Sequence, residues 1–168
     1  VNAANQNAAR RAMDELEAVC GVVFVRGTGG DRIVFNNALV NNSFVGMTGG
    51  AQIINIVNWN FPFVIVHEIM HALGYIHEQS RPDRDMFVTV NNGANGTPNN
   101  VQNTCGANQM MSCQNNFAIV QGVTQTATYD YNSVMHYGPC AFSINCATSP
   151  TVVAPPGAPA ANMGQRQT

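Results

Sequence analysis

Residues 67–77 read HEIMHALGYIH, and this stretch decides what the rest of the chain must hold in place. His67 and His71 are four residues apart, so on a helix both imidazoles project from one face and can bind one ion. Glu68 follows the first histidine, where its carboxylate can reach a water molecule on that ion without occupying a coordination position. The spacing therefore predicts a metal site on a helix, with an acid beside it.

Gly74 supplies the turn that a third ligand needs. It lies three residues after His71, and glycine readily takes the left-handed conformation that ends a helix. The chain can then turn so that His77 reaches the same ion, whereas a continued helix would carry His77 about 9 Å along the axis from His71. We therefore predict that all three histidines bind one metal ion.

Zinc is the metal that this ligand set favours. Neutral imidazole nitrogens suit Zn²⁺, and three protein ligands leave a fourth position for water, as in catalytic rather than structural sites. Zinc can lower the pKa of bound water to about 7. Glu68 would accept the proton of that water and later pass it to a leaving amine. The predicted reaction is hydrolysis of an amide bond, assisted by one Zn²⁺.

The composition narrows the class of protein. The length of 168 residues suits one domain with a sizeable core. Charged residues make up 10% of the chain and the formal net charge is −2, which argues against a nucleic-acid partner. No apolar run is long enough to span a membrane. Abundant asparagine and five cysteines favour a secreted, extracellular protein.

The cysteine spacing suits disulfides better than a metal cluster, because no pair has the C-x-x-C spacing. Our preferred pairing joins Cys105 to Cys113 and Cys140 to Cys146, each closing a short loop, and leaves Cys20 without an internal partner. Other pairings of the five cysteines remain open.

Regular structure is predicted mainly in the first half. An apolar stripe at three- and four-residue spacing predicts a helix over residues 4–20, ended by Gly21. Pro62 suits the first turn of a second helix, which carries the HEIMH segment and is apolar on almost every side. Beyond residue 90 little regular structure is expected. Strands are predicted at residues 22–25, 32–35, 43–45 and 52–57.

A dense cluster of alternating charges follows the third histidine, made up of Arg81, Asp83, Arg84 and Asp85. We interpret it as a solvated turn cross-linked by ion pairs, in preference to a calcium or substrate site.

Two motifs, taken together, resemble a known family. HEIMHALGYIHE matches the metzincin zinc signature, and its continuation HEQSRPDRD resembles the astacin family of metzincin zinc metalloendopeptidases in particular. SVMHYG at 133–138 resembles the Met-turn of that family. The resemblance continues through FVGMTGGAQ at 44–52 and DMFVTV at 85–90, and more faintly through MGQR at 163–166.

The resemblance implies an α+β, metzincin-like catalytic domain of two lobes over residues 1–168. The N-terminal lobe, about 1–77, would hold a twisted, mostly parallel sheet and two long helices. The C-terminal lobe, about 78–168, would be largely irregular, with the zinc cleft between the lobes. The implied activity is that of a secreted zinc endopeptidase that cleaves extended protein or peptide substrates and is made as a zymogen with a propeptide.

The resemblance also assigns roles to residues around the metal. Met135 would form the hydrophobic floor beneath the zinc. Tyr137 would coordinate zinc at rest and swing away to stabilise the oxyanion, and a phenol is a credible donor to a developing oxyanion. Glu78 would be tied through water to the amino terminus of the mature enzyme. His136 lies in the same motif but is expected to be structural rather than a ligand.

The chain departs from the family pattern at three places. The first strand and the last helix of the family are missing from the sequence given, so we expect a fragment or processed form. In such a form Glu78 is expected to lack its usual partner. Asn42 and Trp59 stand near the places of two bridged cysteines of the family.

We consider two alternative functions. The first is a zinc-bearing binding module or inactive protease, and the presence of Glu68 argues against it. The second is a disulfide-stapled structural protein, which would leave three converging histidines unexplained.

Overall fold

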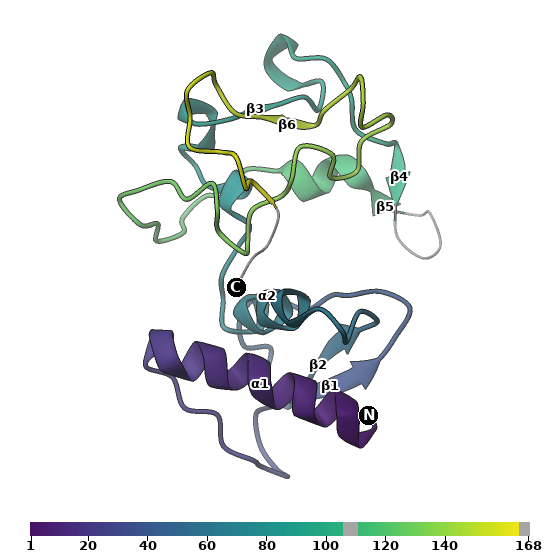
Figure 1. The fold of residues 1–168 in the computed structure, drawn as a ribbon, viewed down its shortest axis with the longest axis vertical. Helices are drawn as coiled ribbons and strands as arrows, with labels where there is room; N and C mark the ends of the chain where they lie inside the picture. The colour runs from purple at the N-terminus through teal and green to yellow at the C-terminus, as the bar shows by residue number, and fades with distance from the viewer. Residues whose placement is uncertain (106–110, 165–168) are drawn as a thin grey trace. The chain divides into compact units, whose positions relative to one another are not determined.

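The protein is described by a computed structural model that covers residues 1–105 and 111–164. It divides into two compact units, the first spanning Val1–Tyr75 and the second beginning at Ile76 (Figure 1). The first unit contains the long helices and a parallel pair of strands, and the second is largely irregular. The predicted α+β, two-lobed class is therefore confirmed. In the described part of the chain, no helix is both long enough and apolar enough to cross a membrane.

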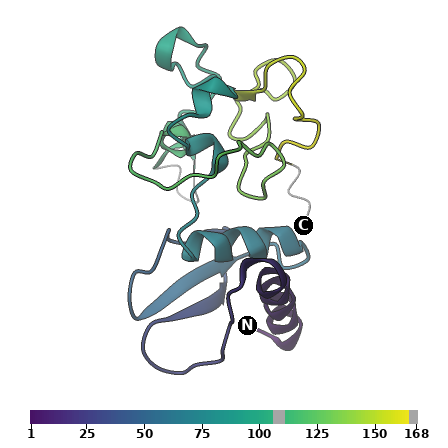
Figure 2. The same ribbon diagram turned by 90° about the vertical axis from the view of Figure 1, so that its left-hand side faces the viewer.

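The first unit follows the order helix, strand, strand, helix. Helix α1 spans Ala3–Cys20, β1 spans Arg32–Asn37, β2 spans Ala51–Ile56 and α2 spans Pro62–Ala72. Strands β1 and β2 are parallel, and their register runs from Arg32 opposite Ala51 to Asn37 opposite Ile56. Helix α2 packs on both α1 and β2 (Figures 1 and 2).

Helix α1 begins one residue before the predicted range of 4–20 and ends at Gly21 as predicted. The Asn2 side chain accepts a hydrogen bond from the Asn5 N–H at 2.9 Å, and Gly21 closes the helix with a φ of 65°. Its buried positions are mostly small, which lets another helix approach closely. They are Ala8, Ala9, Ala12 and Leu16.

Two of the four predicted strands are absent. Residues 22–25 form no strand, because the backbone of Phe24 is bonded to side chains of α1: its N–H donates to Glu17 at 2.6 Å and its carbonyl accepts from Arg10 at 3.3 Å. Residues 43–45 also form no strand, although Asn42 just before them makes a single antiparallel bridge to Asn55. Apolar, β-prone residues give a strand only where a neighbouring backbone is available to pair with.

Helix α2 is buried on nearly every side. Pro62 occupies its first turn, as predicted, where the missing N–H costs nothing. The apolar residues that fill the core around it are Val64, Ile65, Val66 and Ile69. His67, Glu68 and His71 on the same helix are also buried.

The second unit consists of short elements. The helical turns are η1 (Glu78–Ser80), η2 (Arg84–Met86), η3 (Ala94–Gly96) and η4 (Cys113–Phe117), and the strands are β3 (Thr89–Val90), β4 (Thr104–Cys105), β5 (Met111–Ser112) and β6 (Val152–Val153). Strands β3 and β6 pair, as do β4 and β5, both antiparallel. The core includes Val90, Val101, Phe117, Tyr129 and Val152.

The charged cluster after the third histidine is not a solvated turn, so that prediction is wrong for its arginines. Arg81 is 3% exposed and Arg84 is 5% exposed. Arg81 binds Asp83 with two hydrogen bonds of 2.9 Å, and Arg84 bonds Asp85 at 3.0 Å, so the expected ion pairs are present. Both guanidinium groups also donate to backbone carbonyls, which explains why they are buried.

One of the two predicted disulfides is present, between Cys140 and Cys146. Cys105 and Cys113 are not bonded to each other, so that pairing is wrong. The two thiols are nevertheless neighbours that share a hydrogen bond. Burial, with the neighbouring Cys105 thiol, raises the pKa of Cys113 to about 11.

Candidate metal centre and active site

His67 and His71 are held by α2, and the centroids of their rings lie 4.6 Å apart. Both are buried. The Nδ1 of His71 lies 2.8 Å from the carbonyl oxygen of Tyr75, so Nδ1 carries the proton and donates it. The Nε2 lone pair is then available to a metal ion, which is the usual arrangement of a zinc-binding histidine.

Gly74 makes the turn that the sequence predicts. Its φ is 101°, in the region that favours glycine, and its N–H donates to the His71 carbonyl at 2.9 Å. The N–H of Gly46 donates to the same carbonyl at 2.8 Å. The end of α2 is therefore fixed from two sides, immediately after the second histidine.

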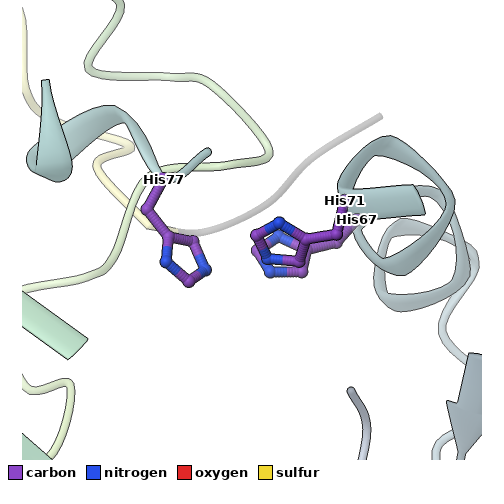
Figure 3. Close-up of side chains that lie close together, drawn as sticks. All are labelled: His67, His71 and His77. Carbon is purple, nitrogen blue, oxygen red and sulfur yellow. The ribbon is translucent and has the colours of Figure 1, made fainter. Parts of the chain in front are cut away.

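The three histidines come together as predicted. The potential ligand atoms of His67, His71 and His77 all lie within 4.8 Å of one another (Figure 3). Imidazole nitrogens are ligands that Zn²⁺ prefers, and three of them leave a fourth position open. Together with the tautomer of His71, this donor set fits Zn²⁺.

Glu68 lies beside this group without belonging to it. It follows His67 on α2 and is only 4% exposed. Among the described residues, the group of potential metal ligands contains the three histidines but not Glu68. A carboxylate buried on an otherwise apolar helix costs free energy, which favours a chemical role over a structural one.

Met135 and Tyr137 lie in the loop that the sequence analysis identified. Both are buried. The Met135 carbonyl accepts a hydrogen bond from the Glu78 N–H at 3.1 Å, which ties this loop to the residue after the third histidine. The ring centroids of Tyr137 and His77 are 4.3 Å apart, so the predicted tyrosine lies directly beside the third ligand.

Glu78 has partners of its own in the structure. Its Oε1 accepts hydrogen bonds from Arg81 and from the Asp130 N–H, each at 2.9 Å. The side chain therefore joins the turn after His77 to the start of the loop that carries Met135. The structural role of Glu78 and its link through water to the amino terminus stay predictions.

His136 is fully buried and is not among the metal-ligating group. Its Nδ1 donates to the Tyr137 carbonyl at 2.6 Å, and its Nε2 accepts from the Tyr129 hydroxyl at 2.7 Å. Burial lowers the pKa of His136, which favours this neutral form. The contacts agree with the structural role expected for His136.

Two residues near Tyr137 were missed by the sequence analysis. Gln79 is fully buried, and its Oε1 accepts from the Tyr137 N–H at 2.9 Å. Gly164 has a φ of 70°, and a methyl group there would clash with backbone atoms of Tyr137 and Gly138. Gln79 sits in a polar segment where periodicity gives no sign of burial; only its position two residues after His77 could have drawn attention to it.

Comparisons with known proteins agree on one family. The family described as Astacin (Peptidase family M12A) matches residues 1–168. Zinc metalloproteinase nas-4 of Caenorhabditis elegans is 38% identical over 125 residues, covering 74% of this chain and 35% of its own length. Flavastacin of Elizabethkingia meningoseptica is 31% identical over 139 residues, covering 80% of this chain and 28% of its own.

A solved structure gives the same result for the fold. High choriolytic enzyme 1, a hatching-enzyme zinc protease from the medaka Oryzias latipes, matches with a TM-score of 0.81 and 29% identity. The match covers 99% of this chain and 77% of that chain. This chain spans only about a third of the length of nas-4, or 35%.

Proposed function

Because the chain belongs to the astacin family, peptidase family M12A, we propose that it is a zinc-dependent endopeptidase that hydrolyses extended protein or peptide substrates. Both units, residues 1–168, would form its single catalytic domain. The observation that carries the proposal is the convergence of His67, His71 and His77 with Glu68 buried beside them.

Each residue of the site has a proposed role. His67, His71 and His77 would hold one Zn²⁺, which when bound supplies a Lewis acid and makes a water molecule more acidic. Glu68 would take a proton from the attacking water and return it to the leaving amine. Its burial supports this role, because a desolvated carboxylate is a stronger base than an exposed one.

Tyr137 would donate its phenolic proton in a hydrogen bond to the oxygen that gains negative charge on the scissile carbonyl. Its ring lies beside that of His77, which supports a position next to the reacting carbonyl. Met135 is buried in the same loop and would act as an apolar floor. Gly74 would keep the third ligand in reach by ending α2.

The test compares the zinc-loaded chain with Glu68→Gln on a mixture of quenched fluorescent peptides. We expect Glu68→Gln to lower kcat/KM by about a thousandfold, within the range for loss of a general base, at equal zinc content. Glu15→Gln is the matched control, since Glu15 is exposed on α1, and it should cleave like the parent. Cleavage that survives in Glu68→Gln would refute the role of Glu68. If the parent protein binds zinc and cleaves none of the peptides, the proposed endopeptidase activity is refuted.

We further propose that the protein is secreted and that its precursor carries a propeptide. The Cys140–Cys146 disulfide supports secretion, because such bonds persist in oxidising compartments. Expression of the full precursor in a secreting cell tests both proposals. Protein recovered from the medium should begin at a residue inside the precursor, as read by amino-terminal sequencing, and purely intracellular protein would contradict secretion.

A further inference from the structure

Gln79 is a buried polar residue that the proposed chemistry does not use. It lies in η1, two residues after His77, and is 0% exposed. Its side-chain Oε1 accepts a hydrogen bond from the backbone N–H of Tyr137 at 2.9 Å. One side chain thus connects the turn that carries the third histidine to the backbone of the proposed oxyanion-binding residue.

The turn that carries Gln79 is itself firmly held. The Ser80 N–H donates to the His77 carbonyl at 3.0 Å, so the turn begins directly at the third histidine. The Gln79 carbonyl accepts a hydrogen bond of 2.9 Å from the Nη1 of the buried Arg84. Because both ends of the turn are fixed, the Gln79 amide can act as a rigid reference point for Tyr137.

The ring of Tyr137 is positioned by its neighbours as well as by its backbone. Its centroid lies 4.3 Å from that of His77, 5.7 Å from that of Phe117 and 5.6 Å from that of Phe142. The backbone of Tyr137 sets the point from which the side chain projects, whichever rotamer the ring takes. A shift of the Tyr137 backbone would therefore move its hydroxyl relative to His77.

We propose that Gln79 is a positioning residue: its amide oxygen fixes the Tyr137 backbone and thereby places the Tyr137 hydroxyl for oxyanion stabilisation. This inference rests on the proposed endopeptidase activity. A displacement of about 1 Å in a reacting group can cost up to about a hundredfold in rate, so even a small shift of Tyr137 should be measurable.

Two variants separate the amide oxygen from the bulk of the side chain. Gln79→Met keeps a similar volume but removes the acceptor. Gln79→Glu keeps an oxygen acceptor, and its second oxygen replaces an NH₂ group that has no hydrogen-bond partner among the described residues. Gln52→Met is the matched control, because Gln52 is also buried and accepts from the Thr48 N–H at 2.9 Å.

The first measurement needs no catalysis. Selective ¹⁵N-tyrosine labelling gives one amide signal for each of the four tyrosines, and Tyr137→Phe identifies that of Tyr137. Loss of a hydrogen bond worth about 1 kcal/mol should speed exchange of the Tyr137 amide by about fivefold to tenfold in Gln79→Met. Gln79→Glu and Gln52→Met should leave its exchange close to that of the parent. Equal exchange in Gln79→Met and the parent would overturn the proposal.

The second measurement is a double-mutant cycle on peptide cleavage. We expect Gln79→Met to lower kcat by about tenfold with KM within about twofold, because only transition-state contacts are affected. The same substitution should change kcat by less than about twofold in a Tyr137→Phe background, since the group that Gln79 positions is then gone. Gln79→Glu should recover most of the lost kcat.

The outcomes distinguish this inference from the proposed function. If the parent protein binds zinc but cleaves no peptide, the proposed endopeptidase activity and the catalytic part of this inference are both refuted. The exchange rate of the Tyr137 amide still shows whether Gln79 holds the Tyr137 backbone. Effects of Gln79→Met and Tyr137→Phe that simply add would show that Gln79 acts as a general structural residue, and would overturn its positioning role.

Discussion

The two units of the molecule are built by different means. In the first unit, α1, α2 and the parallel pair β1–β2 satisfy most of their own backbone, and side chains such as Ile54, Ile65 and Ile69 fill the core. In the second unit the strands are only two residues long, so polar side chains reach the backbone instead. Arg84 donates to the Phe117 carbonyl, and Thr151 donates to the Pro139 and Ala141 carbonyls.

This difference explains why the second unit buries so much polarity. Irregular backbone has carbonyl groups that no helix or ladder satisfies, and a buried carbonyl without a partner costs free energy. Arg81 illustrates the solution: it donates to the carbonyls of Thr126 and Thr128 while binding Glu78 and Asp83. Order in this unit therefore depends on a few buried donors rather than on periodic packing.

The largest effect is expected from removing Arg84, which tests whether buried donors order the second unit. Arg84→Met should lower the free energy of unfolding by about 3 kcal/mol, because it leaves the buried carbonyls of Gln79 and Phe117 without their donor. Urea denaturation followed by circular dichroism measures this. Arg11→Met, at an exposed position of α1, is the control and should change it by less than about 0.5 kcal/mol. A neutral Arg84→Met would show that apolar packing alone orders the second unit.

A smaller loss of stability is expected from changing Gly74, the glycine that ends α2. Gly74→Ala should cost about 1–2 kcal/mol, because alanine is strained at a φ of 101°. It should also weaken zinc binding, since relief of the strain moves His77 away from the other ligands. Denaturation without metal and zinc competition titration measure the two effects. Gly27→Ala is the control: Gly27 does not have a positive φ, and an added methyl group would meet nothing within 4 Å.

The smallest expected effect concerns a single ion pair and depends on pH. The Arg81 hydrogen bond is the main cause of the lowered pKa of Asp83. A lowered folded-state pKa stabilises the fold above the unfolded pKa of about 3.9, and this contribution is lost as pH falls through the folded value. Asp83→Asn should therefore cost about 1 kcal/mol at pH 7 and progressively less below about pH 4.

The measurement is the difference in unfolding free energy between the parent and Asp83→Asn from pH 7 to pH 3. Asp14→Asn is a useful comparison, because Asp14 pairs with Arg10 at an exposed position of α1 and should contribute little. A difference for Asp83→Asn that stayed constant over this range would mean that its charge is not the source of the stability.

Much of the first unit could be predicted from the sequence alone. Helix periodicity, Gly21 and Pro62 gave both helices nearly to the residue, because these signals act locally on the backbone. The spacing of His67, His71 and His77 predicted the metal group for the same reason, since Gly74 and the helix pitch act within one short stretch.

What only the tertiary structure decided depends on contacts between different segments of the chain. The run at 22–25 is not a strand, because side chains of α1 bind its backbone. Cys105 and Cys113 are neighbours but unbonded, which the short loop between them did not predict. The burial of Arg84 and Gln79 follows from carbonyls and amides supplied by distant segments. Local sequence patterns determine helices and ligand spacing, whereas the partner of a polar group is determined only when the chain is folded.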